Sequence, residues 1–147
     1  MMDSIFQVST ISGVIQLAVA PVFLLASISG ALMVLSTRLG RIIDRGRYLR
    51  GRKADANEEE LVDIKAELNR LDTRATYTNW AITLATSCAL LICLVIISLF
   101  VGVVFDINLS TLIAFLFVAA MCCLSSAFIL FLKEVTFSTS AFRFRED

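Results

Sequence analysis

The chain is organised around one long apolar helix that turns basic at its end. Residues 11–37 carry no charged side chain and are rich in Leu, Val, Ile and Ala. An uncharged apolar run of more than about 18 residues is typical of a helix that spans a membrane. Helical spacing continues into Arg38, Arg41 and Arg45, which fall on one face of a helix. This stretch predicts one element that crosses a bilayer and enters water with a stripe of arginines.

Two further apolar stretches predict an all-α integral membrane protein with three transmembrane helices. Hydrophobic residues make up 58% of the 147 residues, and the charges cluster in a few segments. We expect a long cytoplasmic helical hairpin between the first and second transmembrane helices. The predicted segments are an N-terminal lead-in and first transmembrane helix at 1–37, kinked near Pro21, the hairpin at 38–79, a second transmembrane helix at 80–105, an external turn at 106–110, a third transmembrane helix at 111–132 and a cytoplasmic tail at 133–147.

The hairpin is predicted from a change of pattern near Gly51. Asn57 followed by Glu60 matches a capping box that begins a new helix. An apolar stripe on that helix predicts antiparallel packing against the helix of residues 38–50. The stripe consists of Leu61, Ile64, Leu68 and Leu71.

The distribution of basic residues predicts the orientation. All 13 Lys and Arg residues fall within residues 38–76 or the C-terminal tail. By the positive-inside rule, the N-terminus lies outside, and the hairpin and C-terminus are cytoplasmic. We therefore expect a multi-pass protein of the bacterial inner membrane.

One face of the first helix suggests a function. Its polar and small residues are Ser9, Ser12, Gln16, Ser27 and Gly30. Because the chain is too small to enclose a wide aqueous path alone, we expect a homo-oligomer. Several copies gathered around this face would form an anion-leaning ion channel, with Arg38, Arg41 and Arg45 as basic rings at its cytoplasmic mouth.

Two alternatives stay open beside the channel. The arginines can instead bind anionic lipid headgroups, or pair with Asp44 or with acids across the hairpin (Asp63, Glu67 and Asp72). Separately, the protein can be a non-conducting scaffold or accessory protein that recruits a partner through its hairpin. Ala26 and Gly30 form a small-xxx-small pair that suits packing either within or between subunits.

Other classes of function are disfavoured by the residues present. The chain has no histidine, and its predicted spans contain no acidic or basic side chain, so we expect neither an enzyme nor a proton-coupled transporter. The four cysteines lie in apolar runs without Cys-x-x-Cys spacing. We expect no metal, no cofactor and no nucleic-acid partner.

The chain resembles a bacterial membrane family known only as a domain of unknown function. The resemblance rests on Pro21-Val22-Phe23-Leu24-Leu25, followed by Thr37-Arg38-Leu39-Gly40-Arg41-Ile42-Ile43-Asp44-Arg45. It extends to Ser98-Leu99-Phe100, Ala120-Met121 and Phe131-Leu132-Lys133-Glu134-Val135. The resemblance implies a small three-span protein of the bacterial inner membrane and brings no established activity or ligand residues.

Overall fold

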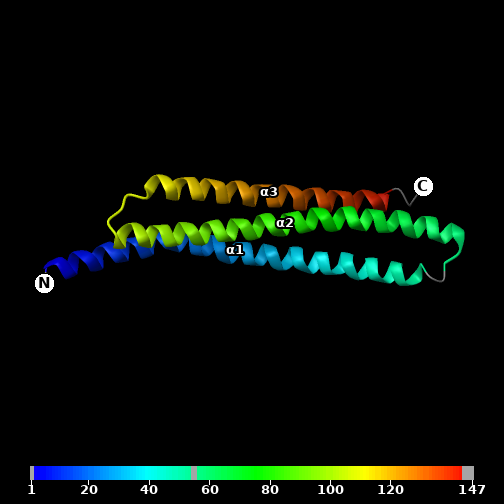
Figure 1. Cartoon of the computed structure of the whole chain (residues 1–147), viewed down its shortest axis with the longest axis horizontal. Helices are drawn as coiled ribbons and strands as arrows, with labels where there is room; N and C mark the ends of the chain where they lie inside the picture. Colours follow the sequence, from blue (N-terminus) through cyan, green and yellow to red (C-terminus); the bar gives the residue numbers. More distant parts are fainter. Residues whose placement is uncertain (1, 54–55, 144–147) are drawn as a thin grey trace. The chain divides into compact units, whose positions relative to one another are not determined.

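The computed structural model consists of three long α-helices (Figure 1). In chain order they are α1 (Met2–Arg52), α2 (Glu58–Val104) and α3 (Ser110–Arg143). The structure describes the backbone of residues 2–53 and 56–143 and the side chains of residues 12–53 and 56–136. Because these residues contain no β-strand, the predicted all-α class is confirmed.

Each helix is long and apolar enough to cross a membrane. The candidate spans are Ser12–Arg52, Glu58–Val104 and Ser110–Thr136. With 51 residues, α1 is about 75 Å long at about 1.5 Å per residue. The hydrocarbon core of a bilayer is only about 30 Å thick, so α1 is long enough for both a span and a water-exposed extension. The chain is a multi-pass membrane protein, as predicted.

The helix boundaries follow from local chemistry. α1 passes through Pro21 and Gly51 without interruption, and a kink at Pro21 stays a prediction. At the start of α2, the Leu61 N–H donates to the Asn57 carbonyl at 2.9 Å. The glutamates at 58–60 occupy the first turn, where acidic side chains suit the positive end of a helix.

A Schellman motif ends α2. The Ile107 N–H donates to the Gly102 carbonyl at 3.0 Å, and Asp106 has a φ of 53°. A Cβ atom added to Gly102 would lie 3.2 Å from the Ile107 carbonyl oxygen. The close approach favours glycine at 102, and the left-handed backbone at Asp106 turns the chain toward α3.

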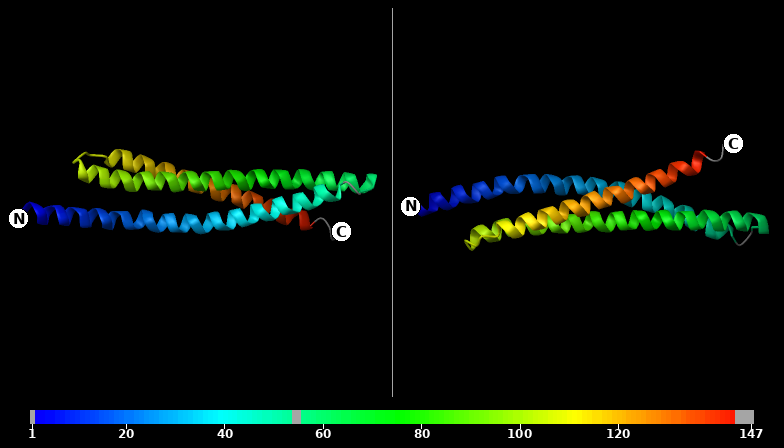
Figure 2. Two further views of the ribbon diagram at one scale, coloured as in Figure 1. Left: turned by 60° about the horizontal axis from the view of Figure 1, so that its bottom comes forward. Right: turned by 90° about the horizontal axis from the view of Figure 1, so that it is seen from above.

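The chain divides into two compact units. The first combines α1 up to Ala31 with Ala85–Ser125. The second combines Leu32–Leu84 with α3 from Ser126. In the second unit, α1 and α2 run antiparallel and side by side, joined by a short connection (Figures 1 and 2). We call residues 38–79 of this unit the hairpin.

Burial follows a seven-residue repeat in each helix. Such a heptad repeat is typical of coiled-coil packing, because it keeps one seam of each helix facing its neighbour. The buried residues that repeat at this interval are Val14, Pro21, Ile28, Leu35, Ile42 and Leu49 in α1, Ile64, Leu71, Thr78, Ala85 and Ile92 in α2, and Ala120, Ala127 and Glu134 in α3.

The hairpin has a small apolar core of its own. Ile42 and Leu49 of α1 form one cluster with Ile64 and Leu71 of α2. Of the other two residues predicted to pack the hairpin, Leu68 is partly buried against this cluster and Leu61 is half-buried. The core contains few residues, so polar contacts contribute much to determining which residues of α1 lie opposite which residues of α2.

Candidate functional site

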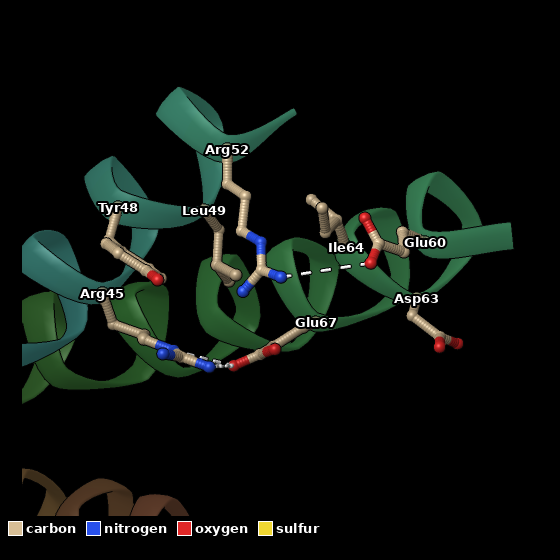
Figure 3. Close-up of a pocket in the computed structure, with 8 residues that line it drawn as sticks. All are labelled: Arg45, Tyr48, Leu49, Arg52, Glu60, Asp63, Ile64 and Glu67. Atoms are coloured by element: carbon tan, nitrogen blue, oxygen red, sulfur yellow. Dashed lines mark hydrogen bonds and ion pairs between the residues drawn. The ribbon is translucent and has the colours of Figure 1, made fainter. Parts of the chain in front are cut away.

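Two ion pairs connect α1 to α2 across the hairpin (Figure 3). The Arg45 Nε and Nη2 atoms each lie 3.0 Å from the Glu67 Oε1 atom. Nearer the tip, the Arg52 Nη2 atom lies 4.0 Å from the Glu60 Oε1 atom. All four side chains are largely exposed, so each pair contributes little stability alone but favours one register.

These ion pairs border an open hollow of about 230 Å³. Leu49 and Ile64 line it with apolar groups, and the Arg45 guanidinium lies 5.6 Å from the centre of the Tyr48 ring. Figure 3 shows the Asp63 carboxylate turned away from both paired arginines. The hollow offers no concentrated set of free polar groups, since its two arginines already face carboxylates.

The ion pairs and the apolar core share one antiparallel register. The residue numbers of Arg52 and Glu60, and of Arg45 and Glu67, add up to 112. A move of seven residues toward the N-terminus of α1 is therefore matched by a move of seven residues toward the C-terminus of α2. The next step in this series places Arg38 opposite Arg74. Two cations at one level would repel each other unless an anion lies between them.

Glu134 of α3 supplies that anion. The Arg38 Nη1 atom donates to the Glu134 Oε2 atom at 2.6 Å. The Arg74 Nη2 and Nε atoms donate to the Oε1 atom at 2.8 and 3.2 Å. We call these three residues the arginine–glutamate triad. It joins all three helices of the second unit through one carboxylate.

The triad is strongly asymmetric in burial. The Glu134 side chain is 1% exposed, whereas those of Arg38 and Arg74 are 39% and 28% exposed. Arg38 also lies over the Phe131 ring, 5.1 Å from its centre. A buried carboxylate is costly unless it is paired and hydrogen-bonded, and both Glu134 oxygens accept hydrogen bonds here. The triad as a whole keeps one excess positive charge.

Thr78 is, besides Glu134, the other buried polar residue among the described residues of this unit. Its side chain is 1% exposed, and its hydroxyl donates to the Arg74 carbonyl at 3.0 Å. No group of three or more potential metal ligands occurs among the described residues. The arrangement fixes helices in register and presents arginines to solvent.

The polar face predicted on α1 lies apart from this triad in the sequence. Ser12, Gln16, Ser27 and Gly30 are exposed on the single chain, and Ser9 lies outside the described side chains. The Ser27 hydroxyl donates to the Phe23 carbonyl of its own helix at 3.0 Å. None of the side chains that the structure describes covers these four residues.

The predicted arginine stripe divides into paired and unpaired members. Arg38 binds Glu134, and Arg45 binds Glu67 across the hairpin. Arg41 is exposed and forms no ion pair with any residue the structure describes. The pairing of Arg45 with Glu67 corresponds to one of the alternatives that the sequence left open.

Sequence reasoning missed the roles of Arg74 and Glu134. Two patterns could have indicated them. Glu134 is the only acid between Asp106 and Glu146, and it directly follows the apolar run of residues 111–132 and Lys133. Arg38, Arg45 and Arg52 also recur every seven residues, and so do Glu60, Glu67 and Arg74, with one reversal of sign at Arg74.

Comparison with known proteins identifies one family. A family model described as "Protein of unknown function (DUF2721)" matches residues 18–144. No curated protein and no solved structure matches the chain. The matched range includes every member of the triad and the whole hairpin.

Proposed function

The chain belongs to the DUF2721 family of proteins of unknown function, and we propose that it is a non-enzymatic, non-conducting, homo-oligomeric membrane scaffold that recruits a partner through its hairpin. The ion pairing of the arginines carries this proposal. The basic ring predicted at the mouth of an anion-leaning channel would need arginines whose charge is not already paired. Arg38 and Arg45 instead hold the hairpin in register through Glu134 and Glu67.

The proposal places the hairpin and the C-terminus in the cytoplasm of a bacterium, with the protein in the inner membrane. The concentration of Lys and Arg within residues 38–76 and the tail supports this orientation. Arg41, exposed and without an ion pair in the described part of the chain, suits contact with anionic lipid headgroups.

Oligomerisation is proposed to occur through the uncovered face of α1. Exposed small residues, including Ala26, Ser27 and Gly30, allow close approach of a second helix backbone. Gln16 is exposed in the same span, and its amide needs a hydrogen-bonding partner in a bilayer. A neighbouring copy supplies both.

The second candidate is the ion channel lined by this same α1 face. The exposure of Ser12, Gln16, Ser27 and Gly30 on one chain favours it, because these groups remain available to line a shared axis. Arg41 would be the remaining basic residue of the stripe at its mouth.

Ion flux into liposomes separates the two candidates. Purified protein is reconstituted, and chloride and potassium flux are compared for the unchanged chain, Arg41→Glu and Gln16→Leu. The scaffold predicts flux no greater than in empty liposomes for all three proteins. Chloride flux that Arg41→Glu reduces would overturn it in favour of the channel.

Orientation and assembly are tested on the same material. In a variant with the four native cysteines replaced, Ala56→Cys is expected to react with an impermeant maleimide only after cell lysis, whereas Ile107→Cys reacts in intact spheroplasts. Labelling with the reverse pattern would overturn the orientation. The particle mass in lipid nanodiscs is expected to exceed that of one chain, and a monomer would contradict the scaffold.

A further inference from the structure

The three helices change from uncharged to charged sequence at one common level. The uncharged segments are residues 4–37, 75–105 and 107–132. Arg38 directly follows the first segment, Arg74 directly precedes the second, and Glu134 follows Lys133 at the end of the third. The hydrogen bonds of the arginine–glutamate triad bring these three boundaries together. Because charged side chains are costly in hydrocarbon, we expect the triad to lie in the layer of lipid headgroups at one end of the spans.

This level carries an excess of positive charge. Arg41 follows Arg38 by three residues, which places both on one face of α1. At about 1.5 Å per residue, Arg41 lies about 4.5 Å beyond Arg38, and a headgroup layer is about 5–8 Å thick. Arg41 is exposed and forms no ion pair within the described ranges. The triad and Arg41 together hold three arginines and one glutamate, a net charge of +2.

The nearest acids on the hairpin leave this excess in place. Asp72 lies two residues from Arg74, about 200° around α2, and so on another side of that helix. Asp44 lies beyond Arg41 on the side away from the bilayer, and no ion pair joins these two described residues. An anion from outside the chain is therefore electrostatically favoured beside Arg38 and Arg41.

Arg38 keeps donors for such an anion. Among the described residues, Nη1 is the only guanidinium atom of Arg38 that donates a hydrogen bond, to Glu134. The N–H groups on Nε and Nη2 are left for a second acceptor, and the side chain is partly exposed. A guanidinium suits a phosphate, because two parallel N–H groups match two phosphate oxygens. Side chains of a helix tilt toward its N-terminus, so Arg38 and Arg41 lean toward the bilayer side of α1.

Apolar side chains border these arginines on the bilayer side. Val34 precedes Arg38 by one turn of α1. In α3, Phe128 precedes Phe131 by three residues, and the Phe131 ring is the one over which Arg38 lies. Val34 and Phe128 are each about half exposed. We call Val34, Arg38, Arg41, Phe128 and Phe131 the interfacial surface. It lies within the second unit and has apolar groups at the depth of acyl chains and arginines at the depth of phosphates.

We propose that the interfacial surface binds one anionic phospholipid of the cytoplasmic leaflet, with its phosphate on Arg38 and Arg41 and an acyl chain along Val34 and Phe128. A lipid without a cationic headgroup suits this surface, because a second cation would be repelled by its net positive charge. A free phosphate ion shares the charge but covers none of the apolar side chains. The inference rests on the orientation proposed above, which puts this surface in the cytoplasmic leaflet, and it adds a defined lipid to the scaffold.

Quenching of tryptophan fluorescence by brominated lipids tests the site. Trp80 is the single tryptophan, so Trp80→Phe with Val34→Trp moves the reporter to the interfacial surface. The protein is reconstituted in mixtures of phosphatidylcholine and phosphatidylglycerol, with one lipid brominated and then the other. The reporter at position 34 is expected to show a clear preference for phosphatidylglycerol.

The unchanged chain provides the matched reporter. Trp80 is exposed and lies two residues, about 200° around α2, from the buried Thr78, so it samples the general lipid shell. Its preference for phosphatidylglycerol is expected to be weaker than that at position 34. An equal preference at the two positions would overturn the inference.

Removal of one arginine tests the charge of the site. In the Val34→Trp background, Arg41→Gln should lower the preference for phosphatidylglycerol about three- to fivefold, the effect of one basic residue at an anionic surface. The matched control, Arg50→Gln, removes an exposed arginine about 18 Å beyond Arg38, outside the headgroup layer, and should leave the preference unchanged. Equal losses would show a general effect of net charge and would refute the site.

Two further comparisons separate the possible causes of failure. Inorganic phosphate at constant ionic strength should leave the preference intact, and its loss would replace the lipid by a soluble phosphate ligand. Quenching requires neither one orientation nor an oligomer, because the brominated lipid is present in both leaflets. A preference found in a monomeric particle would contradict the scaffold and leave the lipid site standing. An oligomer without the preference would refute the lipid site alone.

Discussion

Glu134 is a single acidic residue that resolves a repulsion built into the hairpin. The repeat that brings Arg45 to Glu67 and Arg52 to Glu60 also brings Arg38 to Arg74. Only a carboxylate from a third helix lets these two arginines share one level. The consequence is that α3 is required for the hairpin's own electrostatics.

Glu134→Gln should destabilise the protein markedly. Hydrogen bonds to a charged group typically contribute about 1.5–3 kcal/mol, and their loss here also leaves two partly exposed cations facing each other. Thermal unfolding in detergent measures the loss. The matched control, Glu67→Gln, removes a largely exposed partner and should cost less than about 1 kcal/mol. Similar losses for the two variants would show that Glu134 is not the central contact.

A double variant tests the cause of that loss. Arg74→Glu places a carboxylate level with Arg38, as in the other two pairs, but it sets two carboxylates beside one arginine. Arg74→Glu is therefore expected to lower the melting temperature. Adding Glu134→Gln should raise it again, because Arg38 then faces one carboxylate. Losses that simply add would contradict the like-charge argument.

At the scale of single elements, the sequence predicts the helices well and the contacts between helices less well. Long apolar runs and the arginine stripe predict three long apolar helices, and these are present. The triad was not predicted, because pairing Glu134 with Arg38 and Arg74 depends on which heptad of α3 meets the hairpin. A single acid such as Glu134 next to an apolar run indicates that a basic residue pairs with it. The sequence does not identify that residue.

The end of α2 offers a prediction confined to one turn. Asp106 adopts a left-handed backbone with a φ of 53°, a conformation that costs most residues about 1–2 kcal/mol and glycine very little. Asp106→Gly should leave stability unchanged or raise it by up to about 1 kcal/mol. Asp106→Val should lower it, because a β-branched residue is strained there. Chemical unfolding of the two variants provides the measurement, and a more stable valine variant would refute the role of this turn.

At the scale of the whole molecule, exposed and buried charges should respond differently to salt. Charges on the hairpin surface, such as Arg45 and Glu67, are screened as the Debye length falls from about 10 Å at 0.1 M to about 3 Å at 1 M. Glu134 is buried and is screened much less. High salt should therefore reduce the loss of melting temperature caused by Glu67→Gln, while the loss caused by Glu134→Gln changes little. An equal effect of salt on both losses would contradict the difference in burial between Glu134 and Glu67.

The seven-residue repeat makes the length of the hairpin adjustable in fixed steps. Deleting residues 43–49 together with 64–70 removes the Arg45–Glu67 level but keeps Arg52 opposite Glu60 and leaves the triad in place. Each such step shortens the hairpin by about 10 Å. A deletion of other size in one arm would rotate its buried seam away from its partner. The distance from the bilayer to the hairpin tip can thus change over evolution only in multiples of about 10 Å, the length of one seven-residue repeat.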